Sequence, residues 1–448
     1  MDETLLMVIL IDKSSQLCKV NIQDIGGMDL MKFADWTYKI PESEIRRLLR
    51  YNVKYYYAGG KPGVLPTEII AKILIKIGNN QIKKIEDGFE QEVADDYNYG
   101  VTAGTDFFRK TLAERLRKEG IDTNWEQLMI TTGSQQAIYL LLDALIDPED
   151  VIITTRPAYL GFLGPACKLG ANIVTVPTDL DGIVPEYVEK AIELSKKELG
   201  KKPKMIYLVP DGDNPKGTNL PAKRRQALFD VAEAQDVLII EDSPYRSIHF
   251  KGEKVFPIKS LDKENRRVVY LGSTTKEAIA ARVGYAIAPE DLRENMIKGK
   301  GFFDLCTPLI MQRVLDEYYR NNIDDMLPKI NSIYKARAKA MIDAIDATFP
   351  AGERTDPKGG FFIWWESENK NFDAKEFLER VAMPNEVLFV PGEAFYPLGG
   401  MAYMPDSNSL QPTVAEKHEL RLSYSFKDEE NIREGIPILG KLLTEELA

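Results

Sequence analysis

The sequence predicts an α/β protein, with a large three-layer α/β/α domain on a mostly parallel seven-stranded sheet and a smaller α+β domain formed by both chain ends. Three observations predict this. The chain has 448 residues, which exceeds the ~100–200 residues of an ordinary domain. Short, almost wholly apolar runs alternate with helical patterns through its middle, as in a parallel sheet covered on both faces. Beyond about residue 305 this alternation gives way to a long helical region.

Seven apolar runs of β type supply the expected sheet. They are Leu128–Thr131, Val151–Thr155, Asn172–Pro177, Met205–Val209, Val237–Glu241, Val268–Gly272 and Val283–Ala288. Helical patterns lie before and between them, at Phe108–Lys118, Gln135–Ile146 and Arg224–Gln235. Because ligands bind at the carboxyl ends of parallel strands, we expect the site at that edge of the sheet, facing the smaller domain.

The two chain ends are expected to share the smaller domain. Residues 1–65 are read as an N-terminal arm plus part of this domain, residues 66–305 as the large domain, and residues 306–448 as the rest of the small domain. A helical region is expected from about Leu309 to Phe349. The strands expected after it are Phe361–Glu366, Val387–Pro391 and Leu420–Ser425.

Composition excludes several classes of function. The net charge is −11, with 69 acidic and 58 basic residues, which argues against binding to nucleic acid. No apolar run reaches the ~18–20 residues of a membrane helix. The run Leu5–Ile11 is short and follows acidic residues, so we expect no export signal and a cytoplasmic location. With two histidines, His249 and His418, and three dispersed cysteines, we predict no metal ligand.

Three strand-to-loop junctions carry polar side chains that could bind a ligand. Ser134 and Gln135 stand where a strand leads into a helix, and the free N–H groups of a helix start suit a phosphate, although Ser134 also fits an ordinary N-cap. Tyr159 follows the next strand and could project over the same edge or pack on the surface. Asn214 precedes a proline, so simple turn chemistry also explains it.

A strand that ends in two acids offers a partner for a cationic group. Glu241 and Asp242 close an apolar strand, and Pro244 then turns the chain towards Tyr245. Because side chains alternate along a strand, Glu241 and Asp242 point to opposite faces, and only one of them can face the crevice.

A lysine stands beside a second possible phosphate cradle. Ser273 and Thr275 supply hydroxyls and Arg282 a guanidinium between two predicted strands. Lys276 lies within the same segment. One lysine among many indicates little, but a lysine beside a phosphate cradle and a strand-end acid is a specific combination.

Taken in order, these motifs resemble the fold-type I enzymes that use pyridoxal 5′-phosphate (PLP), specifically the class I/II aminotransferases. The matching motifs run from about Gly59 to Ser425 and read TTGSQQA, PAYLG, PDGDNPKG, IIEDSPY, STTK, ARVGY, PKGGFFIW, VPGEAF and RLSYS. They are similar to the group that holds 2-aminoadipate, kynurenine and aromatic aminotransferases. The resemblance implies PLP as cofactor. It also implies ping-pong transfer of an amino group from an aromatic, 2-aminoadipate or glutamate-like amino acid to a 2-oxo acid such as 2-oxoglutarate.

The resemblance also implies a role for each matching residue. Lys276 forms a Schiff base with PLP and then moves the substrate proton, Asp242 pairs with the pyridine nitrogen, and Tyr245 acts with Asn214 on the phenolic oxygen. The other implied cofactor contacts are Ser134, Gln135, Tyr159, Ser273, Thr275, Arg282 and, from a neighbouring subunit, Tyr99. The implied substrate contacts are Arg421 for the α-carboxylate, Gly60 and Asn214. A homodimer with shared active sites follows from the role of Tyr99.

The sequence departs from the family pattern in three places. The lysine motif reads Ser-Thr-Thr-Lys where the family usually has Ser-Phe-Ser-Lys or Ser-Phe-Ala-Lys, but Thr275 keeps a hydroxyl. The loop from Lys276 to Arg282 is one residue shorter than is common. Residues 1–20 precede the matched region and carry no functional interpretation.

Two questions stay open at this level. The same residues also serve C–S lyases and related carbanion enzymes, and PLP-sensing transcriptional regulators share the fold, although those carry a basic helix-turn-helix domain that the first residues here do not resemble.

The substrate is the second question. Arg46, Arg47 or Lys61 could bind a second carboxylate or be solvated, and Tyr55–Tyr57 could line an aromatic pocket or form a buried strand.

Overall fold

The structure, a computed structural model, describes residues 9–10, 18–19, 32–278 and 281–448. The chain divides into two compact units, residues 1–41 and 42–448. In the first, β1 (Ile9–Leu10) pairs antiparallel with β2 (Cys18–Lys19), and α1 (Trp36–Lys39) is a single turn. Of the N-terminal arm expected within residues 1–65, residues 1–8, 11–17 and 20–31 lie outside the described part of the chain. None of the described helices is long and apolar enough to cross a membrane.

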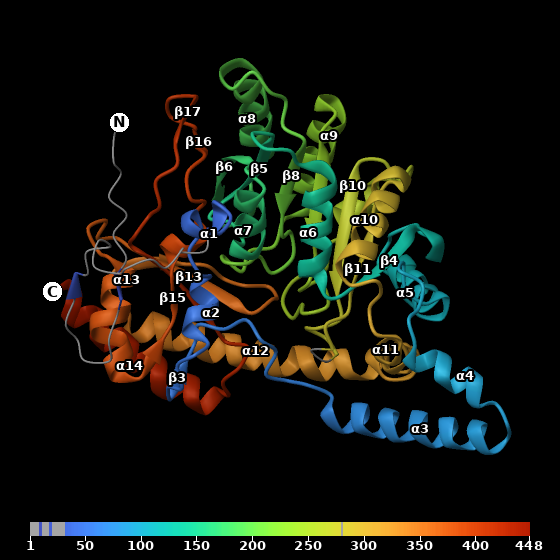
Figure 1. Cartoon of the computed structure of the whole chain (residues 1–448). Coiled ribbons are helices and arrows are strands. Elements are labelled where there is room, and N and C mark those ends of the chain that lie inside the picture. The colour runs from blue at the N-terminus through green and yellow to red at the C-terminus, as the bar shows by residue number, and fades with distance from the viewer. Residues whose placement is uncertain (1–8, 11–17, 20–31, 279–280) are drawn as a thin grey trace. The chain divides into compact units, whose positions relative to one another are not determined.

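The unit of residues 42–448 is built on a large sheet that contains every strand expected for it (Figure 1). The strand order is β17-β16-β6-β5-β8-β9-β10-β11-β4, with β7 paired to β6. The seven predicted segments form β4 (Leu128–Thr131), β5 (Val151–Arg156), β6 (Asn172–Asp179), β8 (Met205–Leu208), β9 (Leu238–Asp242), β10 (Val268–Ser273) and β11 (Gly284–Ile287). Only β11, β7 and β17 pair antiparallel with their neighbours, so the sheet is mostly parallel as predicted.

The predicted number of seven strands was wrong, because the sheet has ten. The additions are β7 (Gly182–Ile183), β16 (Met401–Met404) and β17 (Ser409–Pro412). β16 runs parallel to β6, with Met401 opposite Val174. The entry to β16 requires a glycine at position 400, where φ is +85° and a Cβ would lie 2.4 Å from the carbonyl oxygen of Ile173. The C-terminal part of the chain therefore returns to the edge of the large sheet.

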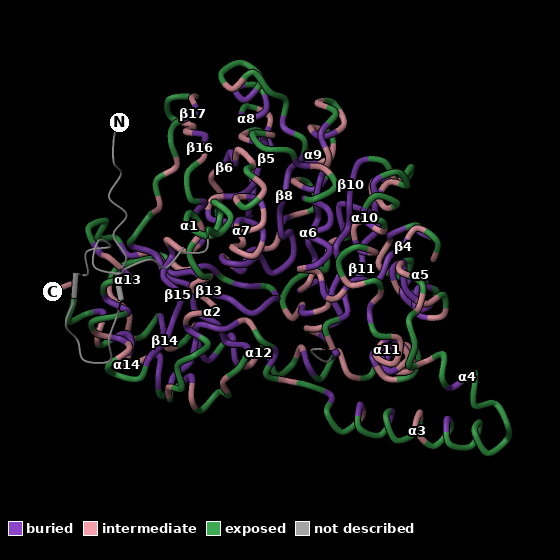
Figure 2. The backbone as a smooth tube through the Cα atoms, viewed as in Figure 1, coloured by how far each residue is buried: buried purple, intermediate pink, exposed green. Residues whose placement is uncertain are grey.

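Helices cover both faces of the sheet and confirm the three-layer arrangement. On one face Ile152 and Ile240 pack into a core with α6 (Ser134–Leu145), α7 (Leu160–Lys168) and α10 (Glu290–Phe303). The alternate residues Ile153 and Ile239 pack on the other face. That face is covered by α8 (Pro185–Glu198), α9 (Ala222–Gln235), α5 (Asp106–Lys118), α11 (Leu309–Asn321) and α3 (Thr67–Glu86). The buried strands stand out in Figure 2 against the exposed outer turns of α3.

The C-terminal part of the unit builds a four-stranded sheet, and a segment near its N-terminal end pairs with a C-terminal strand in a separate two-stranded sheet. The four-stranded sheet has the order β12 (Gly352–Arg354), β13 (Phe362–Ser367), β18 (Glu419–Ser423) and β15 (Val390–Pro391). β3 (Tyr55–Tyr56) pairs in parallel with β14 (Val387–Leu388). Tyr57 is fully buried and donates a hydrogen bond to the carbonyl oxygen of Asn431, 2.8 Å away. Tyr55–Tyr57 are therefore a buried strand segment and not a pocket for aromatic substrates.

The long helical region expected from Leu309 to Phe349 is two helices. α11 ends at Asn321, and α12 (Ile323–Thr348) begins after Asn322, whose φ of −133° is not helical. The remaining helices of the unit are α2 (Glu44–Leu48), α4 (Glu90–Ala94), α13 (Ala374–Phe377) and α14 (Glu429–Leu447). α14 packs along α12, and a Cβ at Gly440 of α14 would lie 2.4 Å from Thr348 Oγ1.

Candidate active site

A cavity at the carboxyl ends of the parallel strands gathers most of the predicted site residues. The predicted residues that line it are Ser134, Gln135, Tyr159, Asn214, Asp242, Tyr245, Ser273, Thr275, Lys276 and Arg282. The strands β4, β5, β8, β9 and β10 all run in the same direction and end at this edge, because β11, which separates β4 from β10, is antiparallel to both. The loops that follow these strands carry the side chains. The remaining lining residues are Arg46, Gly133, Val209 and Pro244.

Lys276 has the environment of a lysine that can be deprotonated near neutral pH. Its Nζ donates a hydrogen bond to the carbonyl oxygen of Gly60, 2.7 Å away. Burial lowers the pKa of Lys276 to about 8, and the nearby guanidinium groups of Arg282 and Arg421 lower it further than Asp242 raises it. The amine is therefore partly neutral at pH 7–8 and available as a base or nucleophile.

Asp242 and Glu241 face opposite sides of β9, as the alternation predicted. Asp242 lines the cavity, and its Oδ2 accepts a hydrogen bond of 2.7 Å from the hydroxyl of Tyr207. Burial raises the pKa of Asp242 to about 7, against the opposing effects of Tyr207 and Lys276. Glu241 points away and accepts hydrogen bonds from the backbone N–H groups of Ile258 and Lys259, at 3.0 and 2.7 Å. Asp242 is thus the acid of the cavity and Glu241 holds a neighbouring loop.

The loop before α6 and the segment after β10 form a cradle for an anion. Gly133 has φ +79°, and a Cβ there would lie 3.1 Å from Nη2 of Arg282, so the close approach of the guanidinium requires a glycine. The Ser273 and Thr275 side chains line the same wall. N–H groups at a helix start, hydroxyls and a guanidinium are the donors that a phosphate prefers. Of the loop from Lys276 to Arg282, residues 279–280 lie outside the described part.

Arg421 is fully buried on β18 and is not among the residues that line the cavity. Its guanidinium donates to Asn214 Oδ1 and to the carbonyl oxygen of Ala58, both at 2.6 Å. It also packs over the Phe362 ring, with 4.2 Å to the ring centroid. Burial lowers the pKa of Arg421 to about 10, so it stays charged at neutral pH. Within the described residues its Nε has no hydrogen-bond partner, which leaves a buried donor for a carboxylate.

Of two further predicted site residues, Gly60 borders the cavity and Tyr99 does not. A Cβ at Gly60 would lie 2.8 Å from Phe362 Cζ and 3.8 Å from Tyr245 Oη, so a glycine is needed where the chain passes the cavity wall. Tyr99 is 79% exposed and is not among the lining residues. The chain by itself therefore does not bring Tyr99 into its own site.

Tyr207 is the contact that the sequence did not reveal. It stacks on Phe162, with ring centroids 3.7 Å apart, and its hydroxyl reaches Asp242 from the neighbouring strand. A tyrosine in the middle of a four-residue strand that is otherwise apolar was the available signal, because a buried hydroxyl needs a partner.

The cavity fits PLP on the evidence of one unsatisfied atom. Oδ1 of Asp242 is buried and, within the described part of the chain, has no hydrogen-bond partner, whereas Oδ2 is held by Tyr207. A buried carboxylate oxygen left without a donor is costly, and a protonated ring nitrogen would satisfy it. The anion cradle and Lys276 line the same cavity. The cavity can thus hold the three parts of PLP together: its ring, protonated at nitrogen, its phosphate and its carbonyl carbon.

Of the three cations considered for a second carboxylate, only Arg46 lines the cavity. Arg46 comes from α2, and the described residues give it no hydrogen bond or ion pair. Arg47, its neighbour, pairs with Glu44 and Glu379 at 2.6 and 3.1 Å. The Lys61 ammonium lies 3.6 Å from the centroid of the Phe426 ring.

Comparisons with known proteins point to one family. The profile of the family "Aminotransferase class I and II" matches residues 78–436. Aromatic-amino-acid aminotransferase 1 of Thermococcus litoralis is 33% identical over 93% of this chain and 94% of its own. A kynurenine aminotransferase of Pyrococcus horikoshii, solved in complex with PMP, superposes with a TM-score of 0.80 at 32% identity, over 93% of this chain and 98% of its own.

A third relative was solved with a cofactor adduct. The α-aminoadipate aminotransferase LysN of Thermus thermophilus, complexed with N-(5′-phosphopyridoxyl)-L-leucine, superposes with a TM-score of 0.80 at 28% identity, over 93% of this chain and 98% of its own. The family match over most of the chain and the identity to these proteins lead to one conclusion: this chain belongs to the class I and II aminotransferases.

Proposed function

We propose that this chain is a PLP-dependent aminotransferase that takes the amino group from acidic and aromatic amino acids, of the 2-aminoadipate, glutamate and kynurenine-like kind, and passes it to 2-oxoglutarate. The observation that carries the proposal is one cavity that holds a lysine of lowered pKa, a buried acid with a free oxygen and an anion cradle. The relatives described above, which act on aromatic amino acids, kynurenine and α-aminoadipate, support the range of substrates.

The residues of the chain divide the work of the reaction. Bound PLP supplies a ring that accepts the electron pair released at the substrate Cα. Lys276 Nζ, neutral in part at physiological pH, holds and moves the proton at that carbon. Asp242 would pair with the ring nitrogen, and Arg421 would bind the α-carboxylate through its buried guanidinium. Tyr245 and Asn214 would hydrogen-bond the phenolic oxygen. Tyr159, whose hydroxyl donates to Gln135 Oε1 at 3.2 Å, would stack on the ring.

The phosphate end is held by the cradle around α6. We assign this role to Ser134, Gln135, Ser273, Thr275 and Arg282, which line the same part of the cavity. Gln135 is itself held by its Nε2, which donates to the carbonyl oxygen of Gly161 at 2.5 Å. Gly60 borders the substrate, where a larger residue would collide with Phe362.

Replacing Arg46 by alanine is expected to separate acidic from aromatic donors. Losing one charged hydrogen bond of ~1.5–3 kcal/mol should lower kcat/KM for 2-aminoadipate and glutamate by roughly 10- to 100-fold. The values for phenylalanine and kynurenine should change little, because these side chains offer no carboxylate at the same place. Steady-state kinetics with a panel of donors and 2-oxoglutarate measure the difference.

Arg47→Ala is the matched control for this experiment. Arg47 lies next in sequence but is engaged by Glu44 and Glu379, so its loss should leave the ratio of acidic to aromatic donors unchanged. An equal loss for both donor classes in Arg46→Ala would instead assign Arg46 to the support of Tyr159, whose pKa it influences. Turnover of donors in the absence of any 2-oxo acid would favour a lyase.

We also propose a homodimer with shared active sites, in which Tyr99 enters the partner's cavity. Gly100 N–H contacts Cys306 Sγ at 3.3 Å, so two segments form one exposed apolar patch. Its exposed members are Tyr97, Tyr99, Val101, Phe302, Phe303 and Leu305. Soluble monomers rarely expose such a patch. Within it Asp304 accepts hydrogen bonds of 2.7 Å from Thr132 and Gln136 at the phosphate cradle.

Phe302→Asp combined with Phe303→Asp should convert the dimer to a monomer that binds PLP more weakly. A charge in the patch has to be desolvated for two copies to associate, and this is costly. Sedimentation velocity and the PLP content of the purified protein report the two effects. Leu180→Asp, at an exposed position in the β6–β7 turn, is the control and should leave both unchanged. A wild-type chain that sediments as a monomer at micromolar concentration would contradict the dimer.

A cytoplasmic location completes the proposal. Cys167 and Cys306 are free thiols, as is usual in a reducing compartment. Cell fractionation tests this point.

The relatives reported above are all named as aminotransferases, so a lyase or a transcriptional regulator is not favoured.

A further inference from the structure

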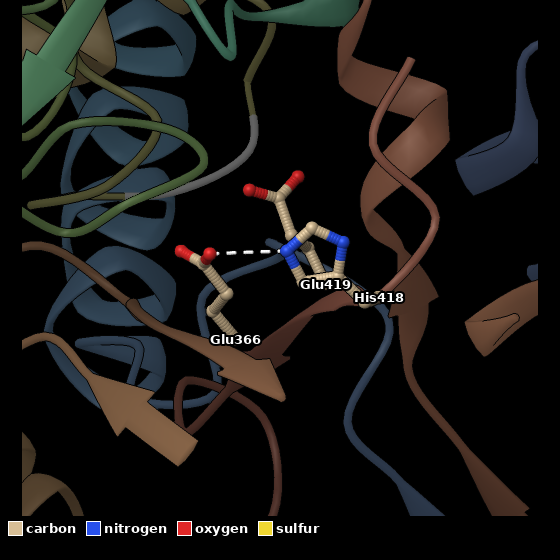
Figure 3. Close-up of side chains that lie close together, drawn as sticks. All are labelled: Glu366, His418 and Glu419. Atoms are coloured by element: carbon tan, nitrogen blue, oxygen red, sulfur yellow. Dashed lines mark hydrogen bonds and ion pairs between the residues drawn. The ribbon is translucent and has the colours of Figure 1, made fainter. Parts of the chain in front are cut away.

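Three side chains with metal-binding atoms meet on the four-stranded sheet, outside the active-site cavity. Glu366 is the last residue but one of β13, Glu419 begins β18, and His418 precedes it (Figure 3). One ligand atom from each, two carboxylate oxygens and an imidazole nitrogen, lies within 4.8 Å of the others. His418 and Glu419 are almost fully buried and Glu366 is partly exposed, so the cluster opens to solvent on one side.

The register of the sheet makes this cluster costly without a cation. Glu366 and Glu419 are directly opposite in the antiparallel pair of β13 and β18. Like charges directly opposite each other destabilise a sheet. Tyr396 donates a hydrogen bond of 2.8 Å to Glu419 Oε2, but no described residue donates one to Glu419 Oε1. Among the described residues, Glu419 therefore keeps one carboxylate oxygen without a donor, close to a second carboxylate.

The imidazole of His418 lies between two carboxylates. Its Nδ1 lies 3.5 Å from a carboxylate oxygen of Glu416, and its Nε2 lies 3.0 Å from Glu366 Oε1. Nε2 donates to Glu366 in one tautomer and accepts from Lys370 Nζ in the other. In the second tautomer the proton is on Nδ1, beside Glu416, and Nε2 has the lone pair with which a histidine binds a metal.

In the structure a lysine ammonium lies beside both Glu366 and His418. Lys370 Nζ lies 2.5 Å from Glu366 Oε1 and 2.9 Å from His418 Nε2. The side chain of Lys370 is 64% exposed. An ion pair of such an exposed lysine contributes little to stability, so the ammonium can leave at small cost.

We propose that Glu366, His418 and Glu419 form a site for a divalent transition-metal ion, with the ammonium of Lys370 as its competitor. Two carboxylates and one imidazole with an open position for water suit Zn²⁺. Tyr396 and Glu416 orient the ligands from behind. The ion joins β13 to β18 two residues before Arg421, so it braces the strand that carries the carboxylate-binding arginine. The sequence predicted no metal ligand, because Glu366 and His418 are 52 positions apart in the chain.

Zinc titration of the holoenzyme, without amino acid, tests the site. A chromophoric chelator in competition for Zn²⁺ should report one ion bound per chain, and the ion should raise Tm in a concentration-dependent way. His418→Ala should weaken binding by at least the ~10- to 100-fold that loss of a supporting residue already costs. Glu366→Gln should weaken zinc binding as well. Because Glu366 is partly exposed, this variant remains informative if His418→Ala does not fold. Lys370→Met should bind several-fold more tightly, because the competing ammonium is gone.

The second histidine of the chain provides the matched control. His249 is one of the two histidines and lies outside the cluster, so His249→Ala should bind zinc as the wild type does. Absence of zinc binding to the wild type would overturn the proposal. Equal binding by the wild type and by both the His418→Ala and Glu366→Gln variants would do so too, since the ion would then sit elsewhere.

Discussion

Replacing Lys276 by alanine should lower the rate of amino transfer by at least the ~10²–10⁴-fold that a positioned proton-transfer group contributes. The variant loses the amine whose pKa burial lowers to about 8, and with it the proposed covalent link to the cofactor. The cradle of Ser273, Thr275 and Arg282 is unchanged, so the variant should still bind PLP, though less tightly. Single-turnover kinetics and the PLP content after gel filtration measure the two effects separately.

A small primary amine added to this variant should restore part of the rate, because it can occupy the space of the missing side chain and carry the same proton. Lys61→Ala is a suitable control, since Lys61 packs over the Phe426 ring and does not line the cavity. Near-normal turnover in Lys276→Ala would refute the assignment of the catalytic amine. Loss of PLP with no rescue by amines would point to a structural role for the lysine.

The large sheet was predictable because its strands are short apolar runs that local pattern reveals. Segments such as Val151–Thr155 and Val268–Gly272 appear within one residue of their predicted ends. β16 and β17 were not found, because this hairpin joins the sheet through the pairing of Met401 and Ala402 with Val174 and Thr175, more than two hundred residues earlier. No local signal encodes a pairing of that range.

The candidate site was predictable where a residue follows a strand in a recognisable motif, as Asp242 and Lys276 do. Partners that come from neighbouring strands or from another helix were not. Tyr207 reaches Asp242 across two adjacent parallel strands, and Arg46 reaches the cavity from α2. The choice between Arg46 and Arg47 depends on the position of Glu379, which pairs with one of the two neighbours and removes it from consideration.

Asp242→Asn should lower kcat and Glu241→Gln should lower the free energy of unfolding, since the two acids face different sides of β9. Asp242→Asn removes the charge that holds a protonated ring nitrogen, and we expect kcat to fall by roughly 10²–10³-fold, as for loss of a preorganised electrostatic group. Glu241→Gln removes the acceptor of the Ile258 and Lys259 amides. It should cost ~1–3 kcal/mol of unfolding free energy and leave kcat near the wild-type value. Kinetics and urea denaturation of both variants measure the contrast.

Tyr207→Phe tests whether the activity depends on the ionised form of Asp242. Burial raises the pKa of this carboxyl to about 7, and the hydrogen bond from Tyr207 holds it below the value that burial alone would give. Removing the hydroxyl should raise this pKa further. Because Asp242 acts in its ionised form, the acid limb of the kcat profile should move to higher pH, and the loss should be small in alkaline buffer. An equal loss at every pH would show that Tyr207 only packs against Phe162 and that the charge of Asp242 is set by other groups.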